Sequence, residues 1–309
     1  MSTRLQHNDP METRKRIAIV GLGNVGKAAL EAVLLAEDMD LAGVVRRSGA
    51  PIPGRTAIPV ADSVEGLGEV DGAILCGPTR AVGDQAVQLL ERGICTVDSF
   101  DIHGASLVEH RARLDRAARA GSAAAVISAG WDPGTNSVIR TLLQAMAPQG
   151  KTHTTFGPGM SMGHTVAARA IPGVRDAVSM TLPAGPGQHR RKVFVELEDG
   201  ADPRAVERAV IEDPYFSRDE TEVVFVERAA DRIDPSHGVR IEREGASGIA
   251  GGQRFAYAMR IDNPALTGQV MVGAMRAALR QGPGCYTLLE VPPVDLLPGD
   301  RATWIRSLV

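Results

Sequence analysis

The stretch Arg16-Ile-Ala-Ile-Val-Gly-Leu-Gly-Asn-Val-Gly26 decides the fold of this 309-residue chain. Its first five residues form an apolar run typical of a buried strand. The pattern Gly21-x-Gly23-x-x-Gly26 follows at once, and Lys27 to Ala36 then has the composition of a helix. In this order the first glycine permits a tight turn, the second lets the backbone approach a pyrophosphate, and the third lets helix and strand pack closely. The stretch therefore predicts a dinucleotide-binding fold.

Two arginines follow the next expected strand, Met39 to Val45. Arg46 and Arg47 stand about 20 residues after Gly26, where a site that prefers NAD usually has an acid for the ribose hydroxyls. Arginine suits a 2′-phosphate instead, through bidentate hydrogen bonds. We therefore expect NADP, and the alternative is an exposed pair at a strand end with no ligand.

Strand and helix patterns alternate up to residue 147, which indicates a Rossmann-type doubly wound parallel sheet. Gly77-Pro78-Thr79 is expected to be a turn over the cofactor. The expected strands after Val45 are 71–76, 94–97 and 123–127, and the expected helices are 84–92, 107–120 and 135–147.

After Gly150 the pattern changes to strands that alternate polar and apolar residues, as in Arg254 to Ile261. This predicts a second, α+β domain built on a mostly antiparallel sheet with one open face. A long amphipathic helix, Pro264 to Arg280, should return to the nucleotide domain. We expect a flexible extension at 1–13, an NADP-binding domain at 14–130 plus 264–309, and a substrate-binding and dimerisation domain at 131–263. The second domain's strands are expected at 152–156, 177–183, 191–198, 221–228, 238–243 and 254–261, with helices at 203–212 and around Ala167.

The composition, with 44% apolar and 23% charged residues, is ordinary for a soluble globular protein. A net charge of −3 argues against nucleic acid or a membrane surface as a partner. No apolar run approaches the roughly 20 residues of a membrane span, and the polar start has no signal core, so a cytoplasmic protein is expected. The three scattered cysteines are expected to be reduced, and the dispersed histidines predict no metal site.

Asp98, Asp101 and Asp132 each follow an expected strand, on the side of the sheet where open α/β folds bind ligands. Asp132 either caps the helix that follows it or takes part in the chemistry, and the residues leave both readings open. In the second half, the stretch Phe156-Gly-Pro-Gly-Met-Ser-Met-Gly-His164 is too rich in glycine for a regular element and is expected to be a loop. Isolated polar residues at strand ends are Thr181, Arg191, His237 and Asn263, each of which is more often structural than functional.

From about Arg16 to Pro293 the chain resembles the meso-diaminopimelate D-dehydrogenase family. The resemblance rests on the glycine motif and on more specific blocks in matching order. These blocks are Thr96-Val-Asp-Ser-Phe-Asp-Ile-His103, Ser128-Ala-Gly-Trp-Asp-Pro-Gly134, the stretch 156–164, Ile171-Pro-Gly-Val174, Asn263-Pro-Ala and Tyr286-Thr-Leu-Leu-Glu-Val-Pro-Pro293.

The resemblance implies NADP-dependent oxidative deamination of the D-centre of meso-2,6-diaminopimelate to L-2-amino-6-oxopimelate and ammonia. The reverse reaction would feed lysine and cell-wall precursor synthesis. It implies that Asp101 and Asp132 hold the reacting D-amino centre and that Trp131 and Phe156 line the pocket, Phe156 where the family often has Trp. Met162 and Gly163 would lie along the substrate, and Thr181, Arg191, His237 and Asn263 would hold the L-amino acid end. The segment between Pro183 and His189 is shorter than in longer members, which leaves the substrate range open.

The chemistry agrees with the residue types. Arg191 can bind a carboxylate bidentately, and either aspartate can take the proton that the ammonium must lose before hydride transfer. None of the four lysines stands in a glycine-rich catalytic motif, so a carboxylate-based site is expected. The expected cofactor contacts are Gly21, Leu22, Gly23, Asn24, Val25, Gly26, Arg46, Arg47, Gly77, Pro78, Thr79, Ser99, Pro133 and Gly134.

Two other functions compete with this one. The chain could be another two-domain NADP reductase, of the dihydrodipicolinate reductase or homoserine dehydrogenase type, or a non-enzymatic NADP sensor. A homodimer or higher homo-oligomer is expected because the second domain exposes an antiparallel sheet.

Overall fold

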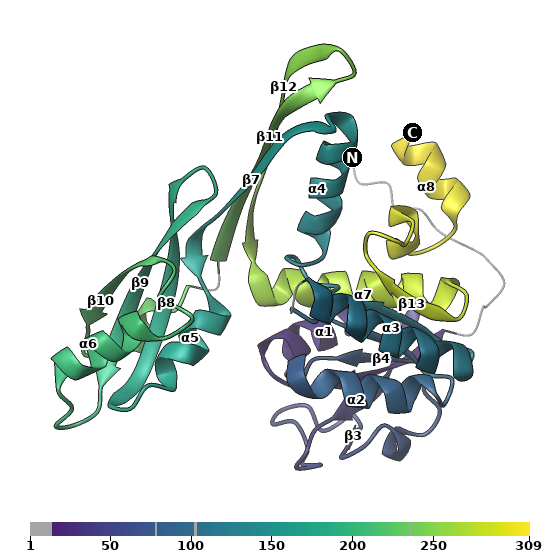
Figure 1. Cartoon of the computed structure of the whole chain (residues 1–309). Coiled ribbons are helices and arrows are strands. Elements are labelled where there is room, and N and C mark those ends of the chain that lie inside the picture. Colours follow the sequence, from purple (N-terminus) through teal and green to yellow (C-terminus); the bar gives the residue numbers. More distant parts are fainter. Residues whose placement is uncertain (1–13, 78, 102–103, 235) are drawn as a thin grey trace, which may run out of the picture. The chain divides into compact units, whose positions relative to one another are not determined.

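The computed structural model describes residues 14–77, 79–101, 104–234 and 236–309 (Figure 1). The expected extension at 1–13 and the expected cofactor contact Pro78 lie outside the described residues, as do Ile102 and His103. The chain forms two compact units. The first contains the described residues up to Val138 together with Pro264–Val309, and the second is Ile139–Asn263.

The first unit is built on a seven-stranded sheet in the order β3-β2-β1-β4-β5-β6-β13. Every recorded pairing in this sheet is parallel. This confirms the expected doubly wound sheet, whose strand order reverses next to β1. Its strands are β1 (Lys15–Val20), β2 (Met39–Val45), β3 (Val60–Ala61), β4 (Gly72–Leu75), β5 (Cys95–Asp98), β6 (Ala124–Ile127) and β13 (Gly284–Thr287).

Helices cover both faces of this sheet (Figure 1). Alternate residues of β1 enter different cores: Ile17 and Ile19 pack with residues of α1 and α7, whereas Ala18 and Val20 pack with residues of α2 and α3. This explains why the strands are continuous apolar runs. Residues of α7 pack in the core of the first unit, although the helix follows the second unit in the chain. The helices are α1 (Asn24–Leu34), α2 (Thr79–Leu90), α3 (Ala105–Ala120), α4 (Thr135–Met146), α7 (Asn263–Arg280) and α8 (Arg301–Leu308), with short 3-10 turns at Glu65–Leu67 and Pro293–Leu296.

Helix α2 begins five residues before the expected start at Asp84, and Thr79 is its first residue rather than part of a turn. The reason is tertiary packing at Gly83. A Cβ built there would lie 3.1 Å from the His110 ring of α3, so this glycine allows two helices to approach and does not break α2. Strand β13 was not expected, because a four-residue strand between glycines and prolines has no periodic signal.

The second unit contains a six-stranded sheet in the order β10-β9-β8-β7-β11-β12. Its pairings are antiparallel except for β9 with β10, which agrees with the expected α+β domain. Its strands are β7 (Gln149–Met160), β8 (Val174–Gly185), β9 (Gln188–Leu197), β10 (Glu220–Phe225), β11 (Ser236–Ser247) and β12 (Ala250–Asp262). Its helices are α5 (Met162–Arg169) and α6 (Pro203–Glu212), with a 3-10 turn at Ala229–Arg232.

The expectation that 156–164 is a loop is wrong. Its first part is the end of β7 and its last part is the start of α5. The glycines are needed because neighbouring strands come close: a Cβ at Gly157 would lie 2.5 Å from the Thr181 carbonyl oxygen, and one at Gly159 would lie 2.4 Å from that of Ser236. Glycine here serves strand packing, which composition alone does not distinguish from loop formation.

The short segment noted between Pro183 and His189 is the tight turn of the β8–β9 hairpin, with Gly185 paired to Gln188. The Thr155 hydroxyl of β7 accepts a hydrogen bond from the Gly187 N–H at 2.9 Å. The hairpin is thus fixed to the neighbouring strand.

No helix among the described residues is both long enough and apolar enough to span a bilayer. The same residues contain no group of three or more histidine, cysteine or acidic side chains arranged to bind a metal ion. Cys76, Cys95 and Cys285 are free thiols, and burial raises the pKa of Cys76 to about 12.

Candidate active site

The glycine motif lies where the carboxyl ends of β1, β2 and β4 meet. Gly21 has φ of 93°, and its N–H donates to the Val45 carbonyl at 2.9 Å. A Cβ at Gly21 would lie 3.1 Å from the Cys76 carbonyl oxygen, at the end of β4. The left-handed backbone and the close neighbour both require glycine. Open α/β sheets bind ligands at such a reversal of strand order.

The other two glycines have different roles, because Gly26 allows close packing and Gly23 leaves open space. Gly26 is buried, and a Cβ there would lie 2.1 Å from the Gly21 carbonyl oxygen, so helix and loop are in contact. Gly23 is the N-cap of α1, and no heavy atom outside its own neighbourhood lies within 4 Å of its Cβ position. The first N–H groups of a helix have no intrahelical acceptor, and the dipole there favours an anion. This backbone cradle fits a dinucleotide pyrophosphate.

Arg46 and Arg47 directly follow β2. Arg46 is half-buried and its Nη1 lies 3.5 Å from the Ala50 carbonyl oxygen, at the limit of a hydrogen bond. Arg47 is exposed. Neither guanidinium has a carboxylate partner among the described residues, so both retain donors for an anion.

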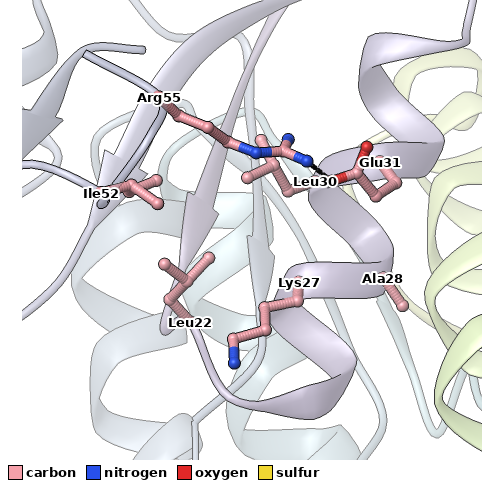
Figure 2. Close-up of a pocket in the computed structure, with 7 residues that line it drawn as sticks. All are labelled: Leu22, Lys27, Ala28, Leu30, Glu31, Ile52 and Arg55. Carbon is pink, nitrogen blue, oxygen red and sulfur yellow. Dashed lines mark ion pairs between the residues drawn. The ribbon is translucent and has the colours of Figure 1, made fainter.

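A pocket of about 300 Å³ lies beside the glycine loop (Figure 2). Figure 2 shows Leu22 of that loop together with Lys27 of α1, and an ion pair between Glu31 and Arg55 at 2.5 Å. The pocket therefore places two cations, Lys27 and Arg55, close to the glycine loop. The remaining lining residues are Ala28, Leu30 and Ile52.

Asp101 and Asp132 follow β5 and β6. Asp101 is exposed, and Asp132 is half-buried. The Asp132 Oδ2 accepts a hydrogen bond from Nδ2 of Asn136 at 3.1 Å, and Asn136 is fully buried in the first turn of α4. Asp132 thus contacts the first turn of α4 through the Asn136 side chain, and this hydrogen bond holds its carboxylate.

The loop around Asp132 is tightly folded. A Cβ at Gly134 would lie 1.8 Å from the Gly130 carbonyl oxygen, and the Trp131 carbonyl accepts the Asn136 N–H at 2.9 Å. Trp131 itself is buried. This folding fixes the direction of the segment that carries Asp132. Ser99 lies close by, with its Cβ 3.7 Å from the position a Gly130 Cβ would take.

In the second unit, Arg191 of β9 is held by two acceptors. Its Nε donates to Oδ2 of Asp219 at 2.7 Å, and its Nη1 donates to the buried Thr181 hydroxyl on β8. The Arg191 side chain is 12% exposed. Sequence analysis missed Asp219, which stands in the turn before β10 and belongs to no recognisable pattern. The structure thus brings Arg191 and Thr181 together.

The charge of Arg191 lowers the pKa of three histidines in the second unit. The pKa of His164 is lowered to about 4 by burial and by the charge of Arg191. Burial and Arg191 likewise lower the pKa of His189, and burial with the same charge lowers that of His237. All three rings are therefore neutral at pH 7.

Hydrogen bonds define the tautomers of two of these rings, His189 and His237. The Phe156 N–H donates to Nε2 of His189 at 2.8 Å, so the His189 proton is on Nδ1. Nδ1 of His237 lies 2.9 Å from the Gly238 carbonyl oxygen and must donate to it. The Phe156 ring lies 5.5 Å from the His189 ring and 6.2 Å from the His237 ring, which joins all three in one cluster.

The other expected contacts lie at element boundaries. Met162, half-buried, and Gly163, exposed, begin α5, and half-buried Asn263 begins α7. The first unit thus contains the expected cofactor contacts together with Asp101, Trp131 and Asp132. The second groups Phe156, Thr181, Arg191 and His237.

A Rossmann unit with a glycine cradle, combined with an α+β unit carrying a cationic polar cluster, defines the class of two-domain nucleotide-dependent dehydrogenases. The family model of the diaminopimelic acid dehydrogenase C-terminal domain matches residues 130–263. The chain is 52% identical to the meso-diaminopimelate D-dehydrogenase of Bacteroides fragilis, over 95% of this chain and 99% of the relative. The chain belongs to the meso-diaminopimelate D-dehydrogenase family.

Two solved structures resemble the chain over its whole length. The DAP dehydrogenase of Corynebacterium glutamicum in complex with DAP superimposes with a TM-score of 0.86 at 32% identity, covering 96% of this chain and 100% of the other. An engineered D-amino acid dehydrogenase bound to NADP⁺ has a TM-score of 0.81 at 32% identity, with the same coverage.

Proposed function

We propose that this chain catalyses the reversible NADP-dependent oxidative deamination of the D-centre of meso-2,6-diaminopimelate, which yields L-2-amino-6-oxopimelate and ammonia. The observation that carries the proposal is the placement of Asp132 by buried Asn136 at the ligand-binding edge of a sheet with a dinucleotide cradle. Family membership supports the substrate, because relatives at up to 52% identity are named for this reaction.

The cofactor contacts follow from the cradle. The backbone around Gly23 and the start of α1 holds the pyrophosphate, and Arg46 and Arg47 hold the 2′-phosphate of NADP. The other proposed cofactor contacts at the loop ends include Gly77, Thr79, Ser99, Pro133 and Gly134. When bound, the nicotinamide accepts the hydride, and the protein supplies orientation and electrostatics.

The residues of the first unit act on the D-amino centre. Asp101 and Asp132 bind the ammonium group, and one of them takes its proton. The lone pair of the neutral amine then forms the C=N bond of the imine as hydride leaves the same carbon. Water then adds to the resulting imine and ammonia departs, with an aspartate again moving the proton. Trp131 forms a wall that excludes bulk water from the reacting carbon.

The residues of the second unit bind the L-amino acid end. Arg191 retains N–H donors on Nη1 and Nη2 for a carboxylate, because Asp219 and Thr181 use only Nε and one Nη1 hydrogen. Neutral His237, whose Nδ1 donates to the Gly238 carbonyl, contacts the same end of the substrate. Asn263 completes the polar contacts, and Phe156, Met162 and Gly163 line the substrate chain.

We further propose a cytoplasmic homodimer. The edge strand β12 alternates exposed and half-buried residues along its length, which supports an exposed sheet face in the monomer.

The test is NADPH formation from purified protein with the meso, LL and DD isomers of diaminopimelate. Turnover is expected with meso-diaminopimelate and its reverse should require ammonia. Turnover of a cyclic imine or an aldehyde without ammonia would instead indicate a reductase of another type, and NADP binding without turnover would indicate a sensor.

A further inference from the structure

We propose that Asp98 and Ser128 form a hydrogen-bonded clamp that fixes the segment carrying Asp101 against the segment carrying Asp132. Both act as positioning residues for the two carboxylates. This inference rests on the proposed function for its catalytic consequence, but the clamp itself is a property of the first unit alone.

Asp98 is the last residue of β5 and is 1% exposed. Its Oδ1 accepts the N–H of Phe100 at 2.9 Å, in its own segment, and the N–H of Ser128 at 3.3 Å, in the segment after β6. Its backbone carbonyl accepts the Ala129 N–H at 2.8 Å. One buried carboxylate thus joins the ends of two strands.

Ser128 completes the link in the opposite direction. It is buried directly after β6 with φ of 53°, and its hydroxyl donates to the Phe100 carbonyl at 2.8 Å. Phe100 therefore both donates to Asp98 and accepts from Ser128. Asp101 is the next residue in the chain, so its backbone leaves the clamp in a fixed direction.

Helix α3 packs against the clamp through its residue His110. The His110 ring stacks on the Phe100 ring with centroids 4.0 Å apart and planes 8° apart. His110 Nε2 lies 3.9 Å from Oδ2 of Asp98, and within the described part of the chain neither atom has a hydrogen-bond partner. The second oxygen of Asp98 therefore lies beside His110, where the amide NH₂ of an asparagine would take its place.

The sheet does not need this carboxylate for its pairing. Strands β5 and β6 are already aligned by the pairs Thr96 with Ala125 and Val97 with Val126. A buried charge is costly, and its hydrogen bonds instead fix what lies beyond the strand ends. A misplacement of about 1 Å in a reacting group can cost about 100-fold in rate, so fixing both aspartate segments has a direct catalytic consequence.

The test compares D98A, S128A and D98N with the full-length enzyme and NADP. D98A and S128A should lower kcat for meso-diaminopimelate by about 10- to 100-fold, while the Kd for NADPH changes by less than about 2-fold. D98N keeps an oxygen acceptor at Oδ1 and places its NH₂ beside His110, so it should retain most of the wild-type kcat. T96V is the matched control: its hydroxyl lies in the same strand, is equally buried and has no hydrogen-bond partner in the described part of the chain, so kcat should stay unchanged.

A second measurement follows the clamp without activity. Amide hydrogen exchange in peptides containing 99–101 and 128–132 should become faster in both D98A and S128A, and should not change in T96V. If D98A does not fold, S128A carries both measurements.

Three results would overturn the inference: wild-type kcat in a folded S128A, a D98N as damaged as D98A, or unchanged exchange in both peptides. A wild-type enzyme without diaminopimelate turnover would reject the proposed function instead, and the exchange measurement would still decide whether the clamp exists.

Discussion

Replacing Gly23 and Gly26 separately by alanine tests the division of roles in the glycine motif. At Gly26 the added Cβ would lie 2.1 Å from the Gly21 carbonyl oxygen, whereas real Cβ contacts essentially never fall below 3.0 Å, so α1 or the loop must move by about 0.9 Å (3.0 minus 2.1). Overpacking of this kind costs about 1–3 kcal/mol, against about 1 kcal/mol that alanine gains over glycine as a helix former. The clash should exceed the gain, and G26A should lower Tm by several degrees.

At Gly23 the Cβ meets open space, so G23A should fold with a loss of at most about 1 kcal/mol from the weaker N-cap. The methyl group would instead occupy space that the pyrophosphate needs. G23A should raise the Kd for NADPH by about 10-fold or more, a loss of about 1.4 kcal/mol. Thermal unfolding and NADPH fluorescence titration measure both variants. A G26A with wild-type Tm, or a G23A that binds NADPH as tightly as wild type, would refute this reading of the loop.

Three further predictions concern charge. Replacing Arg46 and Arg47 together by alanine should raise the KM for NADP by about 10- to 100-fold, because a charged hydrogen bond contributes roughly 1.5–3 kcal/mol. The KM for NAD should change far less. Equal effects on both cofactors would reject the 2′-phosphate role. D219A removes the acceptor for Arg191 Nε and should raise the KM for meso-diaminopimelate by about 10-fold, whereas E222Q, at an exposed pair with Lys192, should not. Burial and the charge of Arg191 lower the pKa of His164 to about 4 from an unfolded value of 6.5. The contribution of this ring to stability should therefore be complete above pH 6.5 and lost as pH falls towards 4. Denaturant unfolding of H164Q should show a free energy of unfolding that depends less steeply on pH over this interval than in wild type, and an identical dependence would contradict the assignment.

The fold was largely predictable because its signals are local. The run Arg16 to Val20, the three glycines and the alternating strands and helices each obey a short-range rule, and the sheet order follows from them. The errors share one cause. Gly157 and Gly159 were interpreted as loop residues and α2 was expected to start only after Gly83, but each of these glycines allows a tertiary approach that only the folded chain reveals.

The candidate site was predictable where a residue stands in a motif and not where it acts through another residue. Asp101, Asp132 and Arg191 came from motifs and from the family resemblance. Asp219, Asn136 and the Asp98 oxygen that joins two strand ends carry no sequence signal, because their partners are between 4 and 30 residues away in the chain. Arg55 was missed for the same reason, since only the fold places it beside the nucleotide loop.

The central claim is that hydride leaves the D-centre of meso-diaminopimelate and no other carbon. Its most direct test uses meso-diaminopimelate deuterated only at the D-centre, with mass spectrometry of the NADPH and of the 2-amino-6-oxopimelate that form. One deuterium is expected in the NADPH and none in the product, because the D-carbon becomes the carbonyl carbon. Unlabelled NADPH formed together with a product that keeps the deuterium would contradict the claim.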